Sequence, residues 1–464
     1  MSNVIARLAA LELKNVKNVK KGKILMPNTT NKKLSMNNAE VLGIYGQNGS
    51  GKTAVVDALF FLQSIMVGFD LDPSVAEYID SGSDSAEINA EFNLFDGKTV
   101  YEVEYQVCLS RSGKEVVIAR ETLKMAKNEA GIRSKKTTFM DYQRSDNNQI
   151  FKPQKRLDEI LEVNKETKTD LIVARKMAEK SNCSYIFGES SRDIFLSKYN
   201  NSFAQYSLII KTLFEFALKD LFVIRNSHSG VISANVILPM AFRIENDNVK
   251  AKGDFAIRLT EPEVFSEKRK SILEMIVNQI NTVLPTIIPG LQVSVKNHGK
   301  QSLDNGEDGW KLELMSKRDG MNEIPIRMES EGIIKIISIL NALIQAFGNP
   351  SICLVIDELD AGIFEYMLGE LLDIFQKSAR GQLIFTSHNL RPLEMLENDS
   401  IMFSTKNPEN RYIHMKNVRD SNNLRNMYIR SITLGGQAEA IYDETDSLKI
   451  ARAFRKAGRG VRSE

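Results

Sequence analysis

Residues 46–53 read Gly46-Gln47-Asn48-Gly49-Ser50-Gly51-Lys52-Thr53 and match the pattern G-x-x-x-x-G-K-[ST]. The apolar run 41–45 before them predicts a buried strand, and the stretch 54–61 after them, which has helical apolar spacing, predicts a helix. Glycines let the backbone wrap around an anion, so the N–H groups of residues 46 and 48–51 can cradle phosphate oxygens. Lys52 adds a cation for the β- and γ-phosphates, and the Thr53 hydroxyl is placed to ligate Mg²⁺. The loop therefore predicts a site for a nucleoside triphosphate with its Mg²⁺.

Length and composition are those of a globular protein with large cores. The chain has 464 residues, of which 42% are hydrophobic and 26% are charged, enough for two or three packed units. Its net charge of +2 does not by itself argue for nucleic acid, although a local patch could still bind it. Cys108, Cys183 and Cys353 lack C-x-x-C spacing, which suits reduced thiols rather than a disulfide framework or a zinc site. With no signal-peptide core and no apolar run approaching about 18 residues, we expect a cytoplasmic protein without a membrane partner.

A second half of the site is predicted near residue 357. Residues 351–358 form an apolar run that ends in two carboxylates, Asp357 and Glu358, as a central parallel strand ends at its functional edge. Asp357 is therefore placed to bind Mg²⁺. Glu358 is the candidate general base, because hydrolysis needs a water oriented and deprotonated in line with the γ-phosphate. The alternative interpretation is that these acids only cap a helix.

Two more polar clusters adjoin apolar runs. Residues 382–389 end in Thr386-Ser387-His388-Asn389, and His388 is one of only four histidines; its imidazole could hydrogen-bond a γ-phosphate and report its presence. Residues 329–335 read Glu329-Ser330-Glu331-Gly332-Ile333-Ile334-Lys335 and open an apolar helix, whose N-terminus is an anion-binding end. The alternatives are a histidine that caps a strand end and a serine that is a plain N-cap.

The pattern along the rest of the chain predicts how the parts are arranged. We expect a first strand over 7–15, an antiparallel hairpin or meander over 87–124, helices over 158–163, 169–179, 206–225 and 263–284, and short strands over 291–328 around the turns Asp304-Asn305-Gly306 and Arg318-Asp319-Gly320. The predicted division is 1–124 as the N-terminal half of one domain, 125–290 as an inserted helical arm or lid, 291–435 as the C-terminal half, and 436–464 as a basic tail. The tail is expected to be a solvated helix end, with an acidic docking partner as the alternative.

Taken in order, the segments GQNGSGKT, ESEGIIK, ICLVIDELD and IFTSHN resemble the Walker A, signature, Walker B and switch-histidine motifs of ABC-type ATPases, in the branch of the SMC and RecF proteins. Within that branch the chain looks most like compact ATPases of the OLD type and the ATPase subunits of bacterial antiphage systems such as PARIS and Septu. The resemblance covers roughly residues 7–66 and 322–435. It implies an α/β fold, an ABC-type ATPase head with a mixed sheet around the P-loop, an antiparallel β subdomain and an inserted helical lid.

The resemblance also implies a sandwich dimer. ATP held by Lys52 and Thr53 of one protomer would be closed over by Ser330 and Gly332 of another, with Asp360 at the loop between the two sites. The segment 11–18 looks like the first strand and turn of the family, which adds Lys17 to the nucleotide contacts.

Three departures from the family pattern matter. The signature is Ser330-Glu331-Gly332 instead of LSGGQ, so only its serine and glycine carry over. No Q-loop glutamine can be assigned from a motif; Gln106, on an expected strand, is the candidate. The residues after His388 hold no metal-binding E…DxD cluster of a Toprim domain, so any nuclease activity would belong to a partner chain.

The function that the resemblance implies is that of a regulatory ATPase in antiphage, abortive-infection defence. Its ATP-dependent homo-oligomer, built from sandwich dimers and extending to a hexamer, would control a separate toxic effector, such as a Toprim or HNH nuclease, in response to a phage-encoded trigger. The alternative is a RecF-like DNA-repair ATPase that clamps duplex DNA. A transporter motor is disfavoured by the long polar insertion between the P-loop and the signature.

Overall fold

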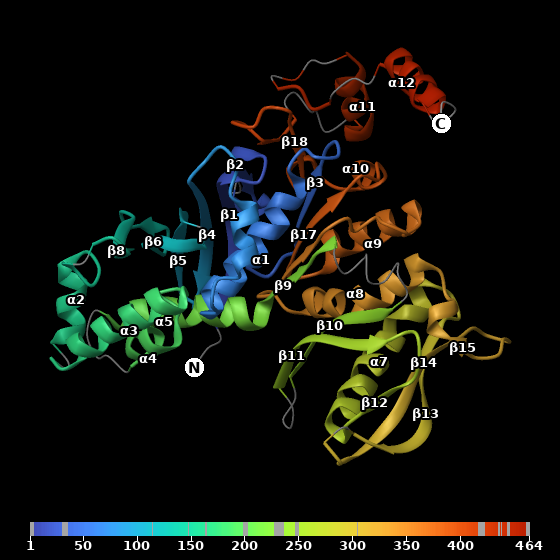
Figure 1. Cartoon of the computed structure of the whole chain (residues 1–464), viewed down its shortest axis with the longest axis horizontal. Coiled ribbons are helices and arrows are strands. Elements are labelled where there is room, and N and C mark those ends of the chain that lie inside the picture. The colour runs from blue at the N-terminus through green and yellow to red at the C-terminus, as the bar shows by residue number, and fades with distance from the viewer. Residues whose placement is uncertain are drawn as a thin grey trace.

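A six-stranded sheet at the centre of the molecule carries the P-loop, as the computed structural model in Figure 1 shows. The structure describes residues 4–29, 36–113, 115–146, 148–162, 165–197, 203–226, 236–245, 250–303, 305–415, 423–434, 437, 439–442 and 446–460. Asp304 of an expected turn and Arg462 of the basic tail lie outside these residues.

The central sheet is mostly parallel. Its strands, in spatial order, are β19 (Tyr412–Ile413), β18 (Ile401–Ser404), β3 (Glu40–Tyr45), β17 (Gln382–Ser387), β16 (Cys353–Ile356) and β9 (Leu221–Ile224). Only the β18–β19 pair is antiparallel. Every residue of β3, β16, β17 and β18 is buried, as expected for parallel strands covered on both faces. Because the strands are parallel, their carboxyl ends share one edge, and the P-loop, Asp357 and His388 follow three of those ends.

An antiparallel sheet forms the second layer. It contains β1 (Ile5–Val16), β2 (Val19–Leu25), β4 (Ser85–Phe95), β5 (Thr99–Ser112), β6 (Glu115–Glu129), β7 (Ile132–Arg133) and β8 (Thr137–Gln143). Buried and partly exposed residues alternate along β4 and most of β5, which is the period-two pattern of the sequence. Helix α1 (Lys52–Val67) shares one apolar core with the inward side chains of this sheet and with Leu42 and Ile44 of β3. The P-loop helix is therefore held between the two sheets (Figure 1).

Four helices extend the apolar core of the antiparallel sheet: α2 (Gln154–Leu161), α3 (Thr167–Ser181), α4 (Glu189–Phe195) and α5 (Ala204–Glu215). A fully buried carboxylate, Glu121 of β6, fixes the segment between α3 and α4 to the sheet. It accepts hydrogen bonds from the Tyr105 hydroxyl, at 2.6 Å, from the Ser184 hydroxyl, and from the backbone N–H of Tyr185, at 2.6 Å.

A third unit has its own core, at the lower right of Figure 1. It consists of β10 (Ile237–Glu245), β11 (Lys250–Arg258), β12 (Glu263–Phe265), α7 (Glu267–Ile287), β13 (Gln292–Ser302), β14 (Asp308–Lys317) and β15 (Ile324–Pro325). This unit packs on α8 (Glu331–Gly348), which also contacts β16. Helix α8 is long and apolar enough to cross a membrane, but 67% of it is buried inside the protein, so it is a core helix.

The remaining helices follow the central strands or lie near the C-terminus. They are α9 (Glu365–Ser378), α10 (Pro392–Met395), α11 (Leu424–Leu434) and α12 (Ser447–Gly460). Short turns of 3₁₀ helix occur at Pro27–Thr29, Pro73–Tyr78, Ile326–Met328 and Asn398–Ser400, and a π-helical turn at Phe216–Asp220.

The predicted α/β class, with a P-loop sheet and an antiparallel β subdomain, is confirmed. The range 125–290, expected as one inserted arm, is distributed over three places. Its first residues complete β6 and form β7 and β8 of the antiparallel sheet, which α2 to α5 cover. Strand β9 enters the central sheet. The elements from β10 to α7 join residues 291–328 in the third unit. The expected helix 206–225 ends at Glu215 and is followed by the π-helical turn. Residues 221–224 are all apolar and form strand β9 instead, because they pair with β16.

Candidate nucleotide site

The P-loop connects β3 to α1 through three glycines with positive φ, Gly46, Gly49 and Gly51. A Cβ at Gly46 would lie 1.9 Å from the Ser404 Oγ, so that position requires glycine. Asn48 and Gly49 are exposed at the tip of the loop, and Ser50 is buried. The loop thus has the backbone freedom and the open tip that phosphate binding requires.

Lys52 is buried at the start of α1 and is held over the loop. Its Nζ donates to the carbonyls of Gly46, at 2.9 Å, and Gln47, at 3.1 Å. Burial lowers the pKa of Lys52, and the nearby carboxylates of Asp357, Glu358 and Asp360 act in the opposite direction. The structure therefore brings the predicted lysine and the predicted carboxylates into one electrostatic site.

Asp357 has the free oxygen that a metal site needs. Its carboxylate is 2% exposed, and Oδ1 accepts a hydrogen bond from the Thr386 hydroxyl at 2.6 Å. Oδ2 is buried and has no hydrogen-bond partner within the described part of the chain. Thr53, the second residue of α1, is half-buried. A hard oxygen donor with unused lone pairs and a hydroxyl beside the P-loop fit Mg²⁺, held directly or through water.

Thr386 and Lys335 orient Glu358, and no sequence pattern assigned a role to either residue. The Glu358 N–H donates to the Thr386 Oγ1 at 2.7 Å, so one hydroxyl bridges the two acidic residues. The Nζ of Lys335, from α8, donates to the Glu358 carbonyl. Glu358 has φ 48°, in the left-handed region that is uncommon for residues other than glycine.

Asp360 connects the acidic loop to His388. Its Oδ2 accepts the backbone N–H groups of His388, at 3.0 Å, and Asn389, at 2.9 Å. The pKa of His388 is lowered by burial and by the positive charge of Lys52, so the imidazole is neutral near pH 7. Within its own chain, Asp360 therefore positions the turn that carries the histidine.

The signature residues lie against the loop after Asp360. Ser330 is the exposed N-cap of α8, and its side chain makes no capping hydrogen bond. Gly332 is packed so tightly that a Cβ there would lie 1.8 Å from the Gly362 carbonyl oxygen. Met328, two residues before Ser330, is 70% exposed, and Phe364, two residues after Gly362, is 67% exposed. The signature end of α8 thus presents an N-cap hydroxyl that makes no capping hydrogen bond, two residues after an exposed apolar side chain.

Lys17 pairs with a carboxylate of the P-loop helix. Its Nζ pairs with Asp57 of α1 and lies 4.6 Å from the Tyr78 ring centroid. The next residue reaches the P-loop, because the Asn18 side-chain amide donates to the Gly49 carbonyl. The pairing of Lys17 with Asp57 gives it a clear structural role, and its predicted contact with nucleotide stays a prediction.

Gln106 lies in the antiparallel sheet, away from this edge. Its amide donates to Glu87 of the neighbouring strand at 3.2 Å. The strand that ends beside β16 is β9, and it is followed by Arg225, whose guanidinium lies 3.9 Å from the Asp57 carboxylate. No pattern in the sequence singled out this short strand.

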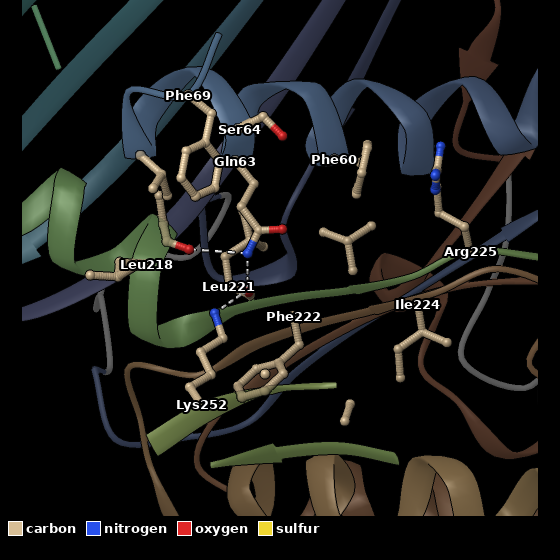
Figure 2. Close-up of a pocket in the computed structure, with 15 residues that line it drawn as sticks. Phe60, Gln63, Ser64, Phe69, Leu218, Leu221, Phe222, Ile224, Arg225 and Lys252 are labelled. Atoms are coloured by element: carbon tan, nitrogen blue, oxygen red, sulfur yellow. Dashed lines mark hydrogen bonds between the residues drawn. The ribbon is translucent and has the colours of Figure 1, made fainter. Parts of the chain in front are cut away.

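A cavity of about 430 Å³ lies beside the C-terminal half of α1, between that helix, β9 and β11 (Figure 2). Gln63 and Lys252 point into it from opposite sides, and both donate to the Leu221 carbonyl, Lys252 at 2.8 Å. Its walls are mostly apolar, with Phe60 covered by the Arg225 guanidinium. Since Gln63 and Lys252 already donate to a backbone carbonyl in its wall, we interpret it as a seam between layers.

Comparison with known proteins gives one family and several structures. A family model described as an AAA ATPase domain matches residues 7–391, which include the P-loop, Glu358 and His388. No curated protein sequence matches the chain.

Among solved structures, the chain is similar to the Smc head domain of Pyrococcus furiosus bound to the C-terminal domain of ScpA, with 16% identity, a TM-score of 0.41, and coverage of 89% of this chain and 96% of that chain. It is similar to the SMC head domain of Thermotoga maritima, with 13% identity, a TM-score of 0.35, and coverage of 88% and 99%. It is also similar to RecF with ATP, described as a recombination mediator, with 13% identity, a TM-score of 0.33, and coverage of 83% and 94%.

Proposed function

Because the chain belongs to the family of AAA ATPase domains and is an ATPase, we propose that it hydrolyses ATP in composite sites that two copies of the chain form together. The observation that carries this proposal is the exposed N-terminus of α8, where the signature residues lie. Ser330 lies exposed at the N-terminus of an 18-residue helix with its hydroxyl unused, while Lys52 and the carboxylates are gathered on the P-loop. A second copy would supply each site with the missing anion-binding end.

The chain's own residues divide the work of hydrolysis. Mg²⁺, when bound to ATP, offsets phosphate charge, and Thr53 and Asp357 would hold it. When ATP binds, the Nζ of Lys52 would donate its hydrogen bonds to phosphate oxygens instead of to the carbonyls of Gly46 and Gln47. Glu358 takes the proton of the attacking water, and its backbone is fixed by Thr386 and Lys335. The neutral imidazole of His388 is available to hydrogen-bond the γ-phosphate.

Complementation between two inactive chains tests the composite site. Lys52→Ala removes the P-loop cation, and Ser330→Arg blocks the signature end, so each homodimer should be inactive. In an equal mixture half of the dimers are mixed and each has one intact site, so about a quarter of the wild-type rate should return. The measurement is steady-state phosphate release from the mixed chains.

The matched control is a mixture of Lys52→Ala with the double variant Lys52→Ala/Ser330→Arg. No pairing of these chains contains an intact site, so no activity should return. Recovery in this control, or a fully active Ser330→Arg homodimer, would contradict a site completed by the second copy.

We further propose that the assembled ATPase holds and releases a separate toxic effector in antiphage defence, in the cytoplasm. Support comes from the likeness of the motifs to those of defence ATPases and from the exposed basic helix α12, whose Lys449, Arg452, Arg455 and Lys456 suit an acidic partner. Neighbouring genes test the setting: a nuclease gene next to this one supports defence. Recombination genes next to it, with salt-dependent binding of duplex DNA, would favour the repair function instead.

A further inference from the structure

The β18–β19 hairpin supports the P-loop from outside with side-chain donors. The Tyr412 hydroxyl donates to the Gly51 carbonyl at 2.6 Å, and this tyrosine is 5% exposed. The Ser404 hydroxyl donates to the Tyr45 carbonyl at 3.0 Å. Both residues follow the residues they contact by more than 300 positions, so a segment distant in sequence returns to support the loop.

Holding the Gly51 carbonyl also sets the direction of the Lys52 N–H. The two groups belong to one planar trans peptide, in which C=O and N–H point in opposite directions. Gly51 is the N-cap of α1, so the Lys52 N–H is one of the helix's first donors, which have no partner within the helix and face an anion. With φ 92°, Gly51 itself is conformationally permissive, and an external hydrogen bond removes that freedom.

The hairpin that carries Tyr412 is itself fixed on two sides. The Tyr412 ring packs on Gly22 of β2, where a Cβ would lie 2.6 Å from the ring, and the Arg411 N–H donates to the Lys21 carbonyl at 3.1 Å. Toward the C-terminus, the Lys406 N–H donates to the Ala440 carbonyl at 2.8 Å, and Glu439 accepts from the side-chain amides of Asn407 and Asn410. Tyr412 is therefore a rigid point between β2 and the C-terminal segment.

We propose that Tyr412 is a positioning residue for phosphate binding, its hydroxyl orienting the Gly51–Lys52 peptide so that the Lys52 N–H points at the nucleotide's phosphates. The inference rests on the binding of ATP at the P-loop. Burial raises the pKa of Tyr412, so its hydroxyl remains a donor throughout the pH range of an assay.

Tyr412→Phe tests the proposal, because it removes only the hydroxyl and keeps the ring that packs on Gly22. One buried neutral hydrogen bond corresponds to a weakening of ADP binding of about five-fold. Inorganic pyrophosphate, which has no base or ribose, should lose affinity by the same factor. The KM for ATP should rise with kcat little changed, and the melting temperature without ligand should stay within about 2 °C of wild type, since the Gly51 carbonyl keeps the Ala54 N–H as a donor.

Tyr428→Phe is the matched control. Tyr428 is also buried, and its ring stacks on Phe403 of the same hairpin at 5.0 Å, so this variant removes a hydroxyl behind the hairpin instead of at the loop. Its affinities for ADP and pyrophosphate should equal those of wild type.

Two results would overturn the role of Tyr412. One is an affinity of Tyr412→Phe for ADP and pyrophosphate equal to that of Tyr428→Phe. The other is a lower melting temperature with unchanged affinity, which would make the hydroxyl purely structural. Failure of the wild-type chain itself to bind ADP would be a failure of the nucleotide site, and it is distinguished because it precedes any comparison of variants.

Discussion

Asp357, Glu358 and Asp360 lie within four consecutive positions of one short loop, yet their partners give them three different tasks. Asp357 keeps one buried oxygen free, Glu358 is held through its backbone by Thr386 and Lys335, and Asp360 uses an oxygen to cap the turn at His388. At the scale of single residues, the hydrogen-bond partners of these three carboxylates therefore give them different roles although their chemistry is the same.

The lowered pKa of His388 predicts a specific pH profile for ATP hydrolysis. Burial and Lys52 both disfavour the imidazolium, so the folded-state pKa lies below the ordinary value of 6.5. If the neutral imidazole is the working form, kcat should stay near its maximum from pH 8 to 7 and should fall along an acidic limb centred below pH 6.5. Phosphate release measured across pH 5 to 8.5 tests this.

His388→Gln is the control for that profile, because glutamine keeps a neutral hydrogen-bonding group that does not titrate. The acidic fall should then move to lower pH, where carboxylates titrate. A wild-type profile whose acidic limb is centred above 6.5 would contradict the prediction.

The residues that we expect to contact phosphate or metal could be identified from the sequence, because polar groups at the ends of apolar strands and a glycine-rich loop form recognisable patterns. The sequence could not predict Thr386, Lys335 or Tyr412 as their supports. A threonine on a strand, a lysine on a helix and a tyrosine after a turn are ordinary in those places, and only the three-dimensional contacts distinguish them.

At the scale of elements, β9 shows where a pattern is insufficient. Four apolar residues after an apolar helix continue its periodicity, and only pairing with β16 makes them a strand. The long strands β4 and β5 were predictable, because alternation over many residues has a single structural meaning.

Helix α12 presents two different faces. Arg452, Arg455 and Lys456 are exposed at helical spacing on one side, while Ile450 and Phe454 are exposed by 44% and 76% on another. A chain ending at Asp446 should hydrolyse ATP at the wild-type rate, because residues 439–442 that hold the β18–β19 hairpin remain. It should lose capture of an acidic effector in a pull-down with the neighbouring gene product.

The variant Arg452→Glu/Arg455→Glu reverses two charges of α12 but keeps the helix, whereas the truncation removes both the charges and the helix. If the positive charge holds the effector, this variant should also fail to capture it. Undiminished effector capture by the truncated chain would place the docking site elsewhere.

At the scale of the whole molecule, a closed sandwich should accumulate when hydrolysis is blocked. Glu358→Gln keeps the side-chain shape but cannot take a proton, so turnover should fall by about 100-fold or more while ATP still bridges two copies. Light scattering with ATP and Mg²⁺ should report a dimer or a larger assembly, up to the proposed hexamer.

Lys52→Ala in the same measurement is the reference for a chain without bound ATP. A Glu358→Gln protein that stays monomeric at micromolar concentration with ATP would exclude the sandwich mechanism and the effector scaffold built on it.

The position of β3 between β17 and β18 also has a consequence in time. Strand β3 is complete at residue 45, whereas its neighbours end at residues 387 and 404, and the tyrosine that supports the loop comes later still. At ordinary rates of synthesis the ribosome needs on the order of tens of seconds to cover that interval. Throughout that interval the apolar strand that will carry the P-loop lacks both of its neighbouring strands, so we expect the nascent chain to gain its affinity for ATP only after residue 412 has been added.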